Sequence, residues 1–147
     1  MKPGFASKFL DVRTQDGLND ILLSVLDYTS ADGRQFRCPI GGTTDGLSVP
    51  RCVQNIIPAT GGDWFSGVLH DSGYRNQLLV YTGDGSWSIA NLSQAECDAL
   101  ILEAMETQGV SWIARHTIYR ALRIAGRFAF ADNRSPAGII RNQLQAV

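Results

Sequence analysis

The residues best suited to chemistry lie in the segment 68–76, where His70 and Asp71 stand side by side. Consecutive residues of a helix point about 100° apart, so these two side chains cannot serve the same neighbour. If His70 meets Asp98 from the next predicted helix, the carboxylate holds one imidazole nitrogen and the other can take a proton from water. Asp71 then points elsewhere and is free to bind a cation. The pattern predicts a general base at His70 and a separate cation ligand at Asp71.

The expected pair of His70 and Asp98 has two interpretations. Asp98 lies at the edge of an apolar helical stripe, where an unpaired carboxylate is costly to bury. The pair can be catalytic, or it can be a satisfied bond that only ties two helices together. Tyr74 follows His70 by one helical turn and can either hydrogen-bond the same carboxylate or only pack. The candidate catalytic residues are therefore His70, Asp98 and Tyr74, with a structural role as the alternative.

A glycine-rich segment, 41–50, supplies candidate ligands for a hard cation near Asp71. Calcium takes about six to eight oxygen ligands from carboxylates, backbone carbonyls and water, and glycine allows the backbone angles that turn carbonyls inward. Asp45 and Gly46 lie in this segment, so the candidate calcium ligands are Asp71, Asp45 and Gly46. The alternative is an ordinary Asp-Gly turn, with Asp71 capping a neighbouring group.

Length and composition predict a single domain over 1–147, with 44% hydrophobic residues, 18% charged residues and a net charge of −1. A charge near zero argues against nucleic acid as a partner. We expect the arginines of the C-terminal third to form a solvated helix face rather than a phosphate-binding stripe. No segment approaches the roughly 20 apolar residues of a transmembrane helix, and the first residues lack the apolar core of a secretory signal. Three cysteines match no disulfide framework or zinc pattern, so we expect synthesis in a reducing cytoplasm.

The order of elements predicts a β-rich part at about 5–50, a helical core at about 63–127 and an irregular tail at 133–147. In the β-rich part, the apolar segment 21–28 and the alternating segment 35–40 flank an Asp-Gly turn, which favours a hairpin. In the core we expect three helices at about 63–76, 93–109 and 111–126, with a small hairpin of 78–81 and 87–90 between the first two. The clearest start signal is the capping box of Ser93 and Glu96.

Four motifs in one order resemble a family of unknown function that is common in tailed bacteriophages and prophages. They are 44–51, then 69–71 with Tyr74, then 95–98 with Leu102 and Met105, and finally 119–123 with Gly126. The resemblance implies a phage-encoded protein, made in the host cytoplasm and incorporated into the virion or tail. Its expected partners are other phage structural proteins.

A narrower resemblance carries chemistry. Segment 70–76 is similar to the active-site helix of the secreted calcium-dependent phospholipases A2, especially their bacterial and fungal branch. The likeness covers about 43–126 and implies that His70 activates water, that Asp98 orients His70, and that Asp71 binds calcium with the Asp45 segment. It also implies the fold: α+β, with an N-terminal β-hairpin region, then a three-helix phospholipase A2-like core with a small β-hairpin between its first two helices.

Two functions remain open at this point. One is a virion- or tail-associated protein that keeps a phospholipase-like His-Asp site. The other is an active calcium-dependent hydrolase of phospholipid esters, which uses the His70–Asp98 dyad at the membrane surface of the host envelope. A peptidoglycan hydrolase is a remote third option, because zinc-ligand spacing is missing. The exposure of His70 and the oxygen atoms around Asp71 distinguish the first two.

Overall fold

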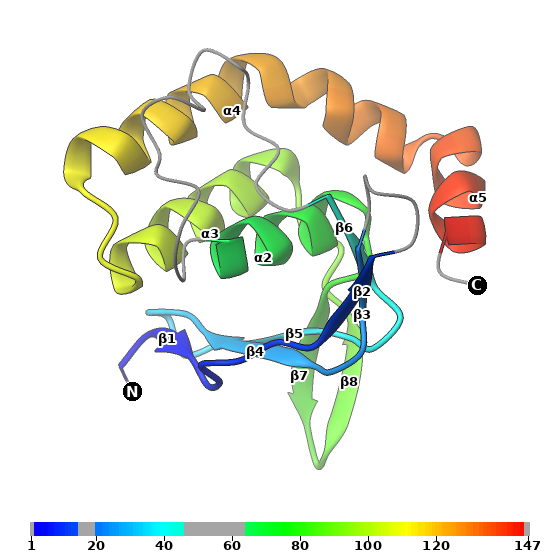
Figure 1. The fold of residues 1–147 in the computed structure, drawn as a ribbon, viewed down its shortest axis with the longest axis horizontal. Helices are drawn as coiled ribbons and strands as arrows, with labels where there is room; N and C mark the ends of the chain where they lie inside the picture. Colours follow the sequence, from blue (N-terminus) through cyan, green and yellow to red (C-terminus); the bar gives the residue numbers. More distant parts are fainter. Residues whose placement is uncertain (1, 15–19, 46–63, 146–147) are drawn as a thin grey trace.

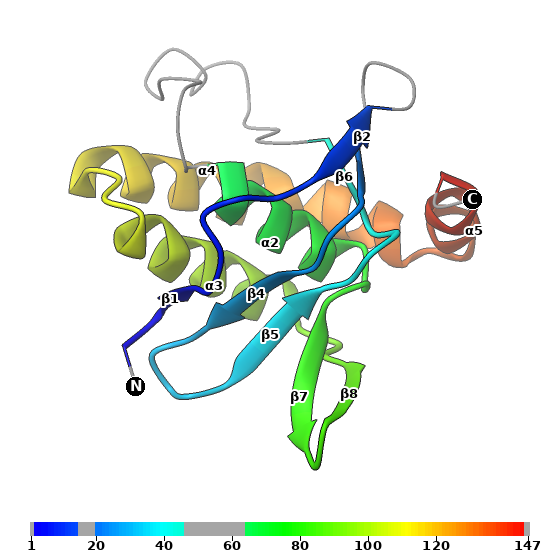
Figure 2. The ribbon, with the colours of Figure 1, turned by 60° about the horizontal axis from the view of Figure 1, so that its bottom comes forward.

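The computed structural model describes residues 2–14, 20–45 and 64–145, which form an α+β fold of two antiparallel sheets and four helices. Figures 1 and 2 show the helices gathered in one layer and the strands beneath and beside them. Helix α2 lies between the strands and the two long helices, so the residues that it carries are enclosed by both layers.

The larger sheet has five strands in the order β1-β4-β5-β7-β8. Their bounds are Gly4–Phe5 for β1, Leu26–Thr29 for β4, Gln35–Cys38 for β5, Leu79–Gly83 for β7 and Ser86–Ile89 for β8. The predicted hairpin of β4 and β5 is present, and its turn contains Gly33 at φ +87°, a left-handed angle that glycine adopts without strain. Alternate side chains of β4 and β5 are buried, as a half-covered sheet requires.

The smaller sheet has three strands in the order β2-β3-β6, with bounds Val12–Thr14, Asp20–Leu22 and Thr43–Thr44. The prediction of one strand over 21–28 is wrong, because this segment is divided between β3 in one sheet and β4 in the other. The hydrogen bonds explain the division. The backbone of Leu22 pairs with Gly41 and Gly42, and the Leu23 N–H bonds to the Asp11 carbonyl, whereas β4 pairs with β5.

The four helices of the described residues are α2 (Trp64–Tyr74), α3 (Gln94–Thr107), α4 (Trp112–Arg134) and α5 (Pro136–Gln145). The capping box at the start of α3 is confirmed: the Glu96 N–H donates to Ser93 Oγ at 3.2 Å, and the Ser93 N–H donates to Glu96 Oε2 at 2.8 Å. None of these helices is sufficiently long and apolar to cross a membrane.

Two helix boundaries differ from the prediction. Helix α4 does not end at Gly126 but continues to Arg134. The glycine serves packing rather than helix termination, since it lets α4 approach α2: a Cβ there would lie 2.5 Å from Tyr74 Oη. The tail predicted as irregular contains α5, which begins at Pro136. Proline suits the first turn of a helix, where its missing N–H costs no hydrogen bond.

The expected phospholipase A2-like core, with three helices and strands outside it only at the N-terminus, is wrong. The small hairpin of β7 and β8 is not an appendage between helices. It extends the N-terminal sheet through the pairing of β5 with β7, in which Phe36 lies opposite Val80. A fourth described helix, α5, packs on α4. The main hydrophobic core therefore joins strand residues such as Tyr28 and Phe36 to the helices.

Candidate functional site

Helix α2 positions three of the candidate residues. Every residue from Phe65 to Tyr74 except Asp71 is buried, because strands cover one side of the helix and α3 and α4 cover the other. His70 and Tyr74 lie one turn apart on one face, with ring centroids 4.0 Å apart. Gly73 allows α3 to approach, since a Cβ there would lie 2.8 Å from Cys97 Sγ. The small residue brings α3, and with it Asp98, close to α2.

The structure places His70, Tyr74 and Asp98 in contact, as the sequence predicted. His70 Nε2 lies 2.8 Å from Asp98 Oδ1, and the Tyr74 hydroxyl donates to the same oxygen at 2.7 Å. Asp98 is 0% exposed and His70 is 7% exposed. The carboxylate is therefore shielded from water and fixed in orientation, and it holds the imidazole by one nitrogen.

The surroundings of Asp98 keep it ionised. Burial raises the pKa of this carboxyl, but hydrogen bonds from His70, Tyr74 and Arg123 outweigh the burial, so the pKa lies below its ordinary value. Burial and the neighbouring carboxylate raise the pKa of Tyr74. The tyrosine thus remains a protonated donor to Asp98 and does not itself act as a base.

Two arginines of α4 belong to the site, although the sequence predicted only a solvated face for them. Arg123 Nη1 donates to Asp98 Oδ2 at 3.0 Å, on the oxygen that His70 and Tyr74 leave unused. Arg134 donates to the carbonyls of Gly73, Tyr74 and Leu92 at 2.8–3.1 Å, and so caps the end of α2. The sequence could have indicated a further partner for Asp98, because a buried carboxylate needs hydrogen-bond donors for both of its oxygens.

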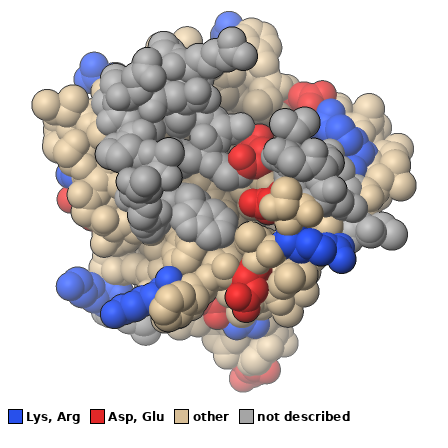
Figure 3. Space-filling model, viewed as in Figure 1, with Lys and Arg blue, Asp and Glu red and all other residues tan. Residues whose placement is uncertain are grey.

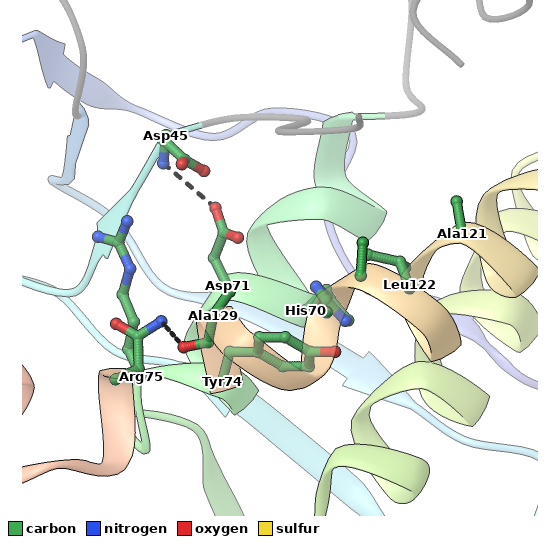
Figure 4. Close-up of a pocket in the computed structure, with 11 residues that line it drawn as sticks. Asp45, His70, Asp71, Tyr74, Arg75, Ala121, Leu122 and Ala129 are labelled. Atoms are coloured by element: carbon green, nitrogen blue, oxygen red, sulfur yellow. Dashed lines mark hydrogen bonds between the residues drawn. The ribbon is translucent and has the colours of Figure 1, made fainter. Parts of the chain in front are cut away.

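A cavity of about 290 Å³ lies between α2 and α4. Figure 4 shows His70, Asp71, Tyr74 and Arg75 lining it together with α4 residues that include Ala121, Leu122 and Ala129. The α4 wall consists mostly of small apolar residues, namely Ala121, Leu122, Ala125, Gly126 and Ala129. His70 lines this cavity, and among the described residues none forms a hydrogen bond with its Nδ1.

The opposite end of the cavity holds a pair of carboxylates. Asp71 Oδ2 accepts a hydrogen bond from Thr44 Oγ1 at 2.6 Å and from the Asp45 N–H at 3.2 Å. Asp71 keeps part of its surface exposed, but the loss of surrounding water still raises its pKa well above its ordinary value, and the charge of Asp45 and a side-chain hydrogen bond with it add to the rise. Asp45 and Asp71 therefore come together as predicted, whereas Gly46 lies outside the described residues.

This pair has the chemistry of a partial site for a hard cation. Loss of solvation is the main cause of the raised pKa of Asp71 and the charge of Asp45 adds to it, so a cation bound by both carboxylates would offset part of this rise. Oxygen ligands are those that calcium prefers. In residues 2–14, 20–45 and 64–145, no cluster of three or more His, Cys, Asp or Glu side chains forms a metal site. Asp45 and Asp71 would thus supply two of the oxygen-bearing side chains.

Residues 21–122 match a family model described as a protein of unknown function, DUF1353. The chain belongs to the DUF1353 family. The DUF1353 match includes all the described candidate residues, Asp45, His70, Asp71, Tyr74 and Asp98, and it ends one residue before Arg123. No curated protein and no solved structure matches the chain.

Proposed function

We propose that this protein hydrolyses lipid esters, with His70 as the base that activates the attacking water. One observation carries the proposal: His70 is bound to a buried, ionised carboxylate through Nε2 and also lines a cavity. An imidazole held in this way has a fixed tautomer, with Nδ1 as the basic nitrogen.

The chemical steps follow from this arrangement. A water bound at Nδ1 gives a proton to His70 while its oxygen attacks the ester carbonyl carbon. Asp98 stabilises the imidazolium that results, and His70 then returns the proton to the leaving alkoxide as the carbon–oxygen bond breaks. Water is the nucleophile in this scheme because the described residues that line the cavity include no serine, threonine or cysteine.

The other residues of the site support this chemistry. Tyr74 and Arg123 hold the two oxygens of Asp98, so the carboxylate cannot turn away from His70. Asp71 and Asp45 would hold calcium, and the ion, when bound, would polarise the ester carbonyl as a Lewis acid. The apolar α4 wall suits an acyl chain, which favours a lipid ester over a small polar one.

A non-enzymatic role in a bacteriophage virion or tail is the second candidate, with other phage structural proteins as partners. The enclosure of His70, at 7% exposed, and of Asp98, at 0% exposed, favours it, because a structural role predicts a closed His70 and the buried carboxylate joins residues of α2 and α4 to α3. Such a network can specify how helices pack without any chemistry. The phage origin itself rests on the sequence motifs described above.

The test compares fatty acid release from phospholipid vesicles by the wild type, His70→Ala and His116→Ala. His116 is the other histidine of the chain and stacks on Trp112, away from the cavity. We expect His70→Ala to lower the rate by about 10²-fold or more, whereas His116→Ala keeps the wild-type rate. Absence of release by folded wild-type protein, with calcium present, would refute the proposal and favour the virion role.

A further inference from the structure

Helix α4 exposes three large apolar side chains on one face. Ile113, Ile124 and Phe128 are 71%, 74% and 68% exposed. About three helical turns separate the first two and about one turn separates the last two, so all three point in nearly the same direction. Trp112, at 60% exposed, directly precedes Ile113 but points about 100° away from it. Apolar side chains exposed together on one helix face make that face a candidate binding surface.

Between Ile113 and Phe128 the charged residues along this face are arginines. Arg120 and Arg127 are exposed on the same side of the helix, and the Arg127 guanidinium lies 4.7 Å from the centre of the Phe128 ring. From Trp112 to Ala131 the sequence has four arginines and no acidic residue, and the acidic residue that follows in α4, Asp132, is paired with Arg141 at 2.7 Å. Figure 3, viewed as Figure 1, shows both basic and acidic side chains on this side of the molecule. The α4 stripe, defined as Ile113, Arg120, Ile124, Arg127 and Phe128, therefore combines apolar and cationic groups.

The stripe borders the cavity that contains His70. Ala125 and Ala129 line the cavity, and they directly follow Ile124 and Phe128 in α4. Both alanines are also exposed, so small apolar side chains connect the outer stripe to the cavity wall. A molecule held against the stripe would have an apolar path into the site.

We propose that the α4 stripe binds an anionic lipid surface. Apolar side chains flanked by arginines match such a surface, because the former enter the acyl boundary while the latter pair with lipid phosphates. A second copy of the chain fits less well, since a symmetric contact of α4 with its copy would bring arginines against arginines. The inference rests on the proposed function, and it specifies the substrate as a lipid ester in a membrane surface that contains anionic lipids.

Cosedimentation with vesicles tests the proposal without any need for catalysis. The probes are vesicles of phosphatidylcholine alone and of phosphatidylcholine mixed with phosphatidylglycerol. We expect the wild type to bind the mixed vesicles more tightly, and the double variant I124D/F128D to bind them at least about tenfold more weakly. The double variant R120Q/R127Q should bind the mixed vesicles more weakly than the wild type, by about fivefold per arginine. Its affinity for vesicles of phosphatidylcholine alone should not change.

Ile40→Asp is the matched control, because Ile40 is 63% exposed and lies outside α4. It should bind like the wild type. All replaced side chains are solvent-exposed, so an unchanged circular dichroism spectrum and melting temperature will show that the variants fold. The proposal is overturned if the wild type binds neither kind of vesicle, if Ile40→Asp weakens binding equally, or if I124D/F128D turns a dimer into a monomer in ultracentrifugation.

The same assay separates this inference from the proposed function. His70→Ala should bind vesicles like the wild type while releasing fatty acid at least about 10²-fold more slowly. Lipid binding by a wild-type protein that releases no fatty acid would refute the hydrolase and leave the stripe in place. Release of fatty acid without vesicle binding would refute the stripe and leave the hydrolase in place.

Discussion

Replacement of Asp98 by asparagine should destabilise the protein far more than the same change at a surface ion pair. The new side chain has nearly the same size, but it carries no charge and presents an NH₂ group in place of one oxygen. It cannot accept hydrogen bonds from His70, Tyr74 and Arg123 at the same time. At least one donor is left without its charged acceptor.

The magnitude follows from burial and the number of donors. A hydrogen bond to a charged group contributes about 1.5–3 kcal/mol, and the loss of one partner from a buried ion pair costs about 3–5 kcal/mol. Asp98 is fully buried, but the Arg123 side chain is 38% exposed and can turn toward water. We therefore expect Asp98→Asn to lower the free energy of unfolding by about 2–4 kcal/mol. For a chain of this length the melting temperature should fall by roughly 5–15 °C.

Urea unfolding of the wild type, Asp98→Asn and Asp27→Asn measures the effect. Asp27 pairs with Arg37 through two bonds of 2.7 Å, and both side chains are 31% exposed. A pair that is open to solvent contributes about 1 kcal/mol or less, so Asp27→Asn serves as the matched control. Equal losses in the two variants would refute the conclusion that the Asp98 network is a buried, charge-assisted one.

Three further predictions follow from the same contacts. Gly126→Ala should force the Tyr74 hydroxyl away from Asp98 and lower the free energy of unfolding by about 1–3 kcal/mol. The loss should be smaller in a Tyr74→Phe background, because the atom that lies 2.5 Å from the added Cβ, Tyr74 Oη, is absent there. Asp71→Asn should raise the free energy of unfolding at pH 8 in chelator, because the raised folded pKa of Asp71 means that its charged form destabilises the fold. Unfolding curves should show that this difference between variant and wild type disappears as the pH falls toward about 4. Addition of calcium should raise the melting temperature of the wild type and leave that of Asp71→Asn unchanged. Because the folded pKa of Asp98 is lowered, the stability that it contributes should be present above about pH 4 and lost below it, so Asp98→Asn should approach the wild type in acid.

The contact of His70 with Asp98 was predictable because each residue type limits its own environment. A carboxylate at the edge of an apolar stripe needs a partner, and His70 and Tyr74 share a helical face, so one oxygen could serve both. The sequence also brought Asp45 and Asp71 together correctly. Arg123 was missed because an arginine on an amphipathic helix can reach either solvent or a neighbour, and periodicity does not decide between them.

The fold was harder to predict than the site, because strand pairing depends on distant segments. The strands around Phe36 and Val80 each have ordinary local patterns, and nothing in either pattern indicates that they pair. Gly126 was interpreted as a helix end, although its role is to make room for Tyr74. Pro136 was placed in an irregular tail, although the Ser-Pro sequence is equally typical of a helix start.

The most direct test of the hydrolase is the mass of the fatty acid released from phospholipid vesicles in oxygen-18 water. If His70 activates water, the wild type should release fatty acid that carries one heavy oxygen, and His70→Ala should release it at least about 10²-fold more slowly. Equal release by the two proteins, or no release by folded wild-type protein with calcium present, would contradict the assignment of His70 as the base.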